Sequence, residues 1–99
     1  MASLKQESGP AVKEIATLLA NRPQLKVYVV GHTDLSGSME YNLHLSKIRA
    51  QAVVEVLVRE HGTAADRLEA HGVGPLVPVA TNHADSGRAK NRRVELVEK

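Results

Sequence analysis

The 99-residue sequence contains no cysteine, no phenylalanine and no tryptophan, and Tyr28 and Tyr41 are its only tyrosines. Without cysteine, the chain can form neither a disulfide framework nor a thiolate metal site. Without a group of stacked aromatics, it lacks the platform on which single-stranded nucleic acids are commonly bound. We therefore expect a light, aliphatic core, and the 42% of hydrophobic and 24% of charged residues are typical of a globular chain.

The sequence also lacks a strong net charge and any long apolar run. A formal charge of +2 is a weak electrostatic footprint for a nucleic-acid-binding protein. No segment approaches the roughly 18 apolar residues that span a bilayer, and the start of the chain has no signal-peptide core, so we expect no membrane insertion by this segment. The length supports one core, and we expect a single domain over residues 1–99. A helical pattern that begins almost at residue 1 indicates a domain excised from a longer protein.

Hydrophobic periodicity predicts an α/β arrangement of helices and strands. Ser8 is the expected N-cap of the first helix, and Gly62 is the expected stop of the long second helix. The first strand is apolar on both faces and is therefore expected inside a sheet, whereas the last strand alternates and should bury one face. The expected helices cover residues 8–21 and 39–61, the strands cover 25–30, 68–72 and 93–97, and a long loop with one helical turn near its end covers 73–91.

A polar, turn-rich segment, residues 31–38, separates the interior strand from the long helix. This position, after a strand and before a helix, is where α/β folds commonly place ligands. Asp34 lies there, close to the helix N-terminus, where backbone N–H groups help to hold a carboxylate. Asn42 and Arg49 are seven residues apart and differ by only about 20° around the helix, so both face the same site. The long Arg49 side chain leans toward the helix N-terminus and can reach the Asp34 loop.

An ordered series of short motifs runs through most of the chain from Leu4 onward. The series comprises Gly31-His32-Thr33-Asp34, Gly37, Asn42, Leu45-Ser46, Arg49-Ala50, Arg67, Gly72-Val73-Gly74, Pro78, Asn82 and the segment from Gly87 to Glu95. In order and spacing it resembles the C-terminal domain of outer membrane protein A and the related domains of peptidoglycan-associated lipoproteins and flagellar motor B proteins.

This resemblance implies an α+β sandwich of βαβαβ topology, with a mixed sheet of three to four strands packed by two main helices. It also implies a domain of a longer envelope protein, located in the periplasm and associated with the outer membrane or cell wall through that protein. The implied activity is non-covalent binding of peptidoglycan through the meso-diaminopimelate of the stem peptide, without catalysis, cofactor or metal. At the matching positions, the ligand-binding residues would be Thr33, Asp34, Leu35, Gly37, Asn42, Arg49 and Arg92.

Two features depart from the family pattern. The strand that usually precedes the first helix is missing or very short, which would leave a sheet edge open and allow a homodimer to form by edge pairing. Leu35 follows the aspartate where many relatives carry a polar residue. A leucine there would change the rim of the pocket while leaving its backbone groups available.

The charges of the expected site match the free end of diaminopimelate, which carries an ammonium and a carboxylate on one carbon. Arg49 can bind this carboxylate with two parallel hydrogen bonds, while Asp34 accepts hydrogen bonds from the ammonium. The alternative is purely structural: Asp34 caps the helix, and Arg49 pairs with it or with a glutamate.

Two catalytic or metal-binding patterns are poorly formed. A helical zinc site needs two histidines at i, i+4 with a carboxylate partner, and this spacing is absent among His32, His44, His61, His71 and His83. A Ser/His/Asp hydrolase built from His32, Asp34 and the nearby serines would lack the strand-turn-helix elbow that positions the nucleophile. We therefore expect no enzyme activity.

Two binding functions remain as alternatives. A basic cluster could bind nucleic acid, although Glu95 and Glu98 dilute it; its members are Arg88, Lys90, Arg92 and Arg93. The domain could also dock onto another envelope protein, with the loop after Gly74 and the last strand as its surface. The resemblance favours peptidoglycan over nucleic acid as the partner.

Overall fold

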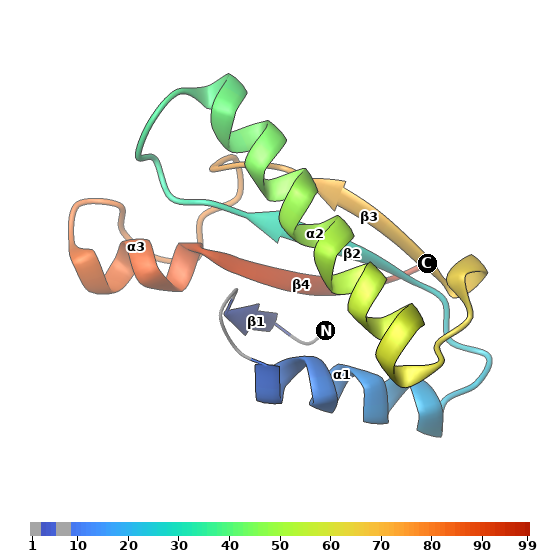
Figure 1. Ribbon diagram of the computed structural model, residues 1–99. Helices are drawn as coiled ribbons and strands as arrows, with labels where there is room; N and C mark the ends of the chain where they lie inside the picture. The colour runs from blue at the N-terminus through green and yellow to red at the C-terminus, as the bar shows by residue number, and fades with distance from the viewer. Residues whose placement is uncertain (1–2, 6–8) are drawn as a thin grey trace.

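The computed structural model describes residues 3–5 and 9–99, with side chains from Val12 onward. Ser8, the expected N-cap of the first helix, lies outside these ranges. None of the described helices is both long enough and apolar enough to cross a membrane. In chain order, the elements are β1 (Ser3–Lys5), α1 (Gly9–Asn21), β2 (Val27–His32), α2 (Met39–His61), a short 3-10 helix (Ala65–Arg67), β3 (Leu68–Gly72), α3 (Asp85–Asn91) and β4 (Arg93–Glu98) (Figure 1).

The four strands form one mixed sheet in the order β1-β4-β2-β3. β2 pairs parallel with β3 through a connection that contains α2, and β4 pairs antiparallel with both β2 and β1. The expected mixed sheet with a very short first strand is confirmed, because β1 spans three residues. β2 is interior, as its apolar sequence predicted, but it starts at Val27 because Leu25 N–H closes a turn onto Arg22 O (3.0 Å). Pairing of an outer strand with a second chain stays a prediction.

The hydrophobic core lies between one face of the sheet and the helices α1 and α2, which Figure 1 shows on the same side of the sheet. All its members are aliphatic, as the composition predicted. They alternate along the strands and recur at helical spacing along the helices, so that each element turns one face toward this core. The core residues are Ile15, Leu19, Leu25, Val27, Val29, Ala50, Leu57, Leu68, Val94 and Leu96.

The N-terminal half of α2 lies unusually close to the ends of β2 and β3. Gly31 and Gly72 are neighbours in the parallel pair, and a Cβ atom at Gly72 would lie 2.5 Å from Ser46 Oγ and 2.7 Å from Lys47 Cα. Only glycine leaves room for this approach. Because of this close approach, the buried Ser46 hydroxyl accepts a hydrogen bond from Gly74 N–H (2.9 Å). The first turns of α2 are therefore fixed against the strand ends from which the polar loop extends.

The prediction of a single buried face on the last strand is wrong for its first half. Arg93, Val94, Glu95 and Leu96 are all buried. Val94 and Leu96 face the core, whereas Arg93 and Glu95 lie on the opposite face, beneath the segment that follows β3. Arg93 donates to Val77 O (2.9 Å) and pairs with Glu95, so the loop covers this end of the sheet and the two charges satisfy each other.

The guanidinium of Arg67 closes the opposite end of the sheet. It donates to the carbonyl oxygens of Leu19, Arg22 and Leu25 at 2.8–3.0 Å. These include carbonyl groups at the C-terminal end of α1, which have no partner within the helix. Arg67 is therefore a structural residue that fixes the connection between α1 and β2.

His32 lies on the covered face of the sheet and makes stability depend on pH. Its Nδ1 atom is buried and has no hydrogen-bond partner among the described residues, and its Nε2 atom is 3.7 Å from Glu95. Burial lowers the pKa of His32 below its ordinary 6.5, and the Arg93 charge acts in the same direction against the opposing effect of Glu95. Between the lowered pKa and 6.5 the unfolded chain binds more protons, so stability is complete above pH 6.5 and falls below it.

We expect the free energy of unfolding, measured with urea between pH 7.5 and 5, to fall on acidification by at most about 1.4 kcal/mol per pH unit from this group. The variant His32→Gln should flatten this slope, because the titrating ring is gone. The exposed His83→Gln variant serves as the control and should keep it. A slope that persists in His32→Gln would assign the acid sensitivity to another group.

Candidate functional site

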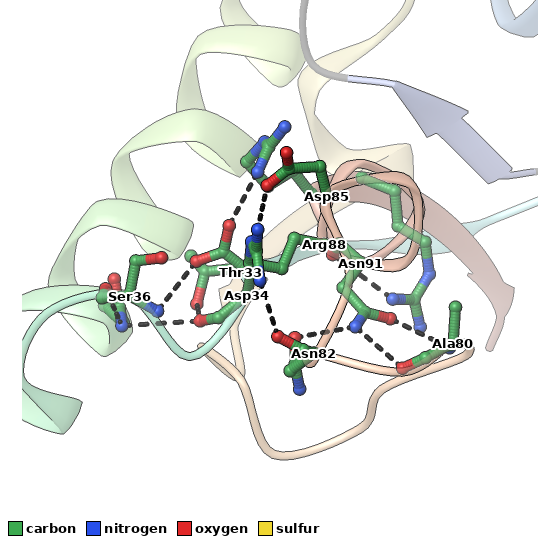
Figure 2. Close-up of polar contacts among 11 residues, drawn as sticks. Thr33, Asp34, Ser36, Ala80, Asn82, Asp85, Arg88 and Asn91 are labelled. Carbon is green, nitrogen blue, oxygen red and sulfur yellow. Dashed lines mark hydrogen bonds and ion pairs between the residues drawn. The ribbon is translucent and has the colours of Figure 1, made fainter.

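The site is built around the carboxylate of Asp34, in the loop between β2 and α2. The Oδ1 atom accepts a hydrogen bond from the Ser36 N–H group (2.8 Å), which is a tight turn of the chain on itself. The Oδ2 atom accepts one from Arg92 Nη1 (2.6 Å), and Arg92 reaches it from the residue after α3. The carboxylate is buried, with 8% of the Asp34 side chain exposed against 39% for Arg92. Figure 2 shows the Asp34 carboxylate beside Ser36.

These contacts keep Asp34 ionised. Burial alone would raise the pKa of the carboxyl, but the Ser36 N–H group and the Arg92 guanidinium outweigh it and hold the pKa below its ordinary 3.8. The anion is therefore present at every pH above about 4. A buried carboxylate that stays charged can bind a cationic group that reaches it.

Asn42 holds the loop through hydrogen bonds to its backbone carbonyl groups. Its Nδ2 group donates to Ser36 O (2.8 Å) and, more weakly, to Asp34 O (3.4 Å), and the side chain is buried on the first turn of α2. Thr33 Oγ1 also bonds to Asp34 O (2.9 Å), while Thr33 N–H donates to Gly74 O (2.9 Å). Thr33 and Asn42 thus hold the backbone of the loop, and Asn42 points at the loop carbonyls.

The expected backbone support for Asp34 occurs before the helix rather than at its first turn. Ser38 is the N-cap of α2 and accepts from Tyr41 N–H (3.1 Å), so the alternative in which Asp34 caps the helix is not what the structure shows. Gly37, between the two, has a φ of +87°, which favours glycine and lets the chain turn into α2. From the sequence, Ser36 was considered only as a serine of the rejected hydrolase pattern, although the spacing Asp34-x-Ser36 is a signal for such a side-chain turn.

Arg49 is the one expected charge that the structure leaves apart from Asp34. It lies half-buried on α2, one residue from the buried Ala50, and within residues 12–99 no hydrogen bond or ion pair joins it to Asp34. Asp34 is paired with Arg92 instead. The structure therefore brings together Thr33, Asp34, Asn42 and Arg92. Joint binding of one ligand by Asp34 and Arg49 stays a prediction.

The rim of the site is apolar and exposed. Leu35 has 57% of its surface exposed, and Tyr41 has 60%. The side chain of Leu35 is therefore open to solvent, and its effect on the rim of the pocket stays a prediction.

The basic cluster does not form a free cationic surface. Arg88 pairs with Asp85 and donates to Asn82 O (2.9 Å), Arg92 pairs with Asp34, and Arg93 is buried against Glu95. Three of its four cations therefore already have carboxylate partners. Among the residues that the structure describes, no three histidines, aspartates or glutamates are grouped as metal ligands, and His32 lies beside Glu95 rather than in a hydrogen-bonded serine triad.

A mixed sheet with two helices on one face, and a buried carboxylate in the loop after its inner strand, defines a small α+β domain. The sequence model of the OmpA family matches residues 1–92. The chain belongs to the OmpA family.

Three known proteins show how closely the chain follows this family. It is 44% identical over 92 residues to outer membrane porin F of Pseudomonas aeruginosa, covering 93% of this chain and 26% of the relative. It is 41% identical over 92 residues to the peptidoglycan-binding protein ArfA of Mycobacterium tuberculosis, covering 89% and 28%. The crystal structure of the peptidoglycan-associated lipoprotein from Burkholderia pseudomallei superimposes with a TM-score of 0.86 at 30% identity, covering 100% of this chain and 91% of that one. The chain thus spans about a quarter of the length of these two curated relatives.

Proposed function

We propose that this domain binds peptidoglycan non-covalently and without catalysis, through the meso-diaminopimelate of the stem peptide. In this role it anchors a longer envelope protein to the cell wall from the periplasm. The observation that carries the proposal is the ionised, buried Asp34 carboxylate in a loop flanked by Arg92 and by the helix that bears Arg49. Two of the relatives bear names that refer to peptidoglycan, and both match over most of this chain.

The chemistry of the ligand fits these groups. The free end of diaminopimelate presents an ammonium and a carboxylate on one carbon, so it needs one anion and one cation on the protein. Asp34 supplies the anion and accepts from the ammonium, and Arg49 supplies a planar fork of donors for the carboxylate. Arg92 remains bonded to the Oδ2 atom of Asp34 and keeps the carboxylate charged. The exposed Leu35 side chain contacts the methylene groups between the two ends of the ligand.

A competition experiment tests this assignment. The purified domain is expected to co-sediment with diaminopimelate-type peptidoglycan, and a soluble tripeptide that ends in meso-diaminopimelate should release it. The matched tripeptide with lysine keeps the ammonium but lacks the second carboxylate, so Arg49 has no partner. Since hydrogen bonds to charged groups contribute about 1.5–3 kcal/mol, the lysine peptide should compete roughly 10- to 100-fold less well.

The possible results separate the alternatives. Equal competition by both peptides would overturn the carboxylate contact while leaving the ammonium contact. Co-sedimentation that neither peptide reduces would contradict diaminopimelate recognition and favour the glycan strand or an envelope protein as the partner. No co-sedimentation would contradict the proposed function as a whole.

A further inference from the structure

We infer that Asn91 is a positioning residue for this site: its carboxamide locks the 79–82 loop onto the end of α3, and this places the Arg92 guanidinium against Asp34. The inference rests on the proposed function only in taking Asp34 as the centre of the site. It concerns a residue that touches neither Asp34 nor the loop between β2 and α2. Figure 2 shows Asn91 with its partners Ala80 and Asn82, in the same view as Asp34.

The Asn91 side chain is fully buried and uses every hydrogen-bonding position that it has. Its Oδ1 atom accepts from Val79 N–H (2.8 Å) and Ala80 N–H (3.1 Å). Its Nδ2 group donates to Ala80 O (2.9 Å) and Asn82 Oδ1 (2.8 Å). A carboxamide can accept two bonds and donate two, so it is saturated by one short stretch of loop. No other side chain of similar size carries this set of donors and acceptors.

Two further contacts hold the same loop against the same helix. A Cβ atom at Gly87 would lie 2.9 Å from the carbonyl carbon of Thr81, so the loop backbone lies directly on α3. Arg88 donates to Asn82 O (2.9 Å) and pairs with Asp85. Helix α3 has only seven residues and is too short to be stable by itself. Its position therefore depends on this loop, and Asn91 supplies four of the bonds between them.

Arg92 is the next residue after Asn91, so its backbone position is fixed when Asn91 is fixed. Its N–H group donates to Arg88 O (3.1 Å), which is the last backbone bond of α3. Within residues 12–99, Asp34 is the hydrogen-bond partner of its guanidinium. The side chain is 39% exposed and has no other polar anchor among those residues. The direction in which the Arg92 side chain leaves α3 therefore depends on the position of α3 against the 79–82 loop. The hydrogen bonds of Asn91 fix that position.

The test is a double-mutant cycle on the pKa of Asp34, measured by carbon-detected NMR titration of the free domain. Arg92→Ala should raise this pKa because it removes the guanidinium. Asn91→Ala should raise it by more than half as much, although Arg92 is still present. In the double variant the rise should not exceed that of Arg92→Ala alone, because the effect of Asn91 passes through Arg92. Additive rises, or no rise in Asn91→Ala, would overturn the inference.

Two controls separate positioning from general loss of stability. Leu57→Ala weakens the buried core near the far end of α2 and should leave the pKa of Asp34 unchanged. Asn82→Ala removes one of the four partners of Asn91 and should give a smaller rise in the same direction; if Asn91→Ala does not fold, the cycle is run with Asn82→Ala. Because the titration uses no ligand, it decides the inference even if wall binding fails. If the domain binds peptidoglycan but the two pKa rises add in the double variant, the positioning role of Asn91 is contradicted and the proposed function stands.

Discussion

Asp34→Asn is expected to lose binding to diaminopimelate-type peptidoglycan while keeping the fold. The amide has the same shape and can still accept from Ser36 N–H, but it carries no charge for the ligand ammonium or for Arg92. Removal of one partner from a buried charged pair costs about 2–5 kcal/mol, so the dissociation constant should rise at least roughly 30-fold. Co-sedimentation and titration with the diaminopimelate tripeptide would measure the loss.

The matched control for this variant is Asp66→Asn, which removes the same charge from an exposed position on the short 3-10 helix. It should bind as the parent protein does. Circular dichroism and urea unfolding should show both variants folded, because the freed Arg92 is partly exposed and can be hydrated. Normal binding by Asp34→Asn would remove the central anion from the proposed mechanism.

Gly72→Ala is expected to destabilise the domain by about 3 kcal/mol, which is large for the replacement of one hydrogen atom by a methyl group. The new methyl group would meet Ser46 Oγ and the backbone of Lys47, and the Lys47 backbone cannot move without shifting α2 from the sheet. For a domain of this size, the midpoint of thermal unfolding should fall by roughly 12 °C or more. The shift would also move Asn42 from the loop carbonyls, so peptidoglycan binding should weaken in the folded fraction.

Gly62→Ala is the informative comparison. Gly62 ends α2 with a φ of +69°, and a Cβ atom there would meet no other atom within 4 Å. That variant has backbone strain without a steric clash, and it should cost about 1 kcal/mol. Equal destabilisation by the two changes would show that the close approach of α2 to β3 does not limit this fold.

Local pattern was enough to predict most of the framework. The period of the apolar residues predicted α1 and α2, and the β-rich run ahead of Gly31 predicted the interior strand β2. The alternation of the last strand was misleading, because Arg93 and Glu95 are polar and yet buried. Their burial depends on a loop near Val77 that is distant in sequence, and no pattern within the strand reports what covers it.

The site was predictable in its composition but not in its connections. The sequence predicted that Asp34 lies in the loop between β2 and α2 and that the Asn42 side chain faces this loop. Helical geometry placed Arg49 on the face that looks toward the site, and a direct pair of Arg49 with Asp34 was the structural alternative. The ion pair that forms instead uses Arg92, 58 residues along the chain, which the family resemblance had placed at the pocket. Such a pair depends on how α3 is seated by the Asn91 network. Hydrogen bonds from one side chain to a distant backbone leave little trace in a single sequence.

The place of β4 in the sheet has a consequence for the order of folding. Residues 93–98 form an inner strand with neighbours on both sides, and they follow every other element of the domain. The sheet cannot be completed during synthesis until these residues have left the ribosome, since β1 has no strand to pair with before then. Pairing of segments so far apart is intrinsically slow. A nascent chain of this domain can therefore pair β2 with β3 early, but it joins β1 to the sheet only after residues 93–98 have emerged.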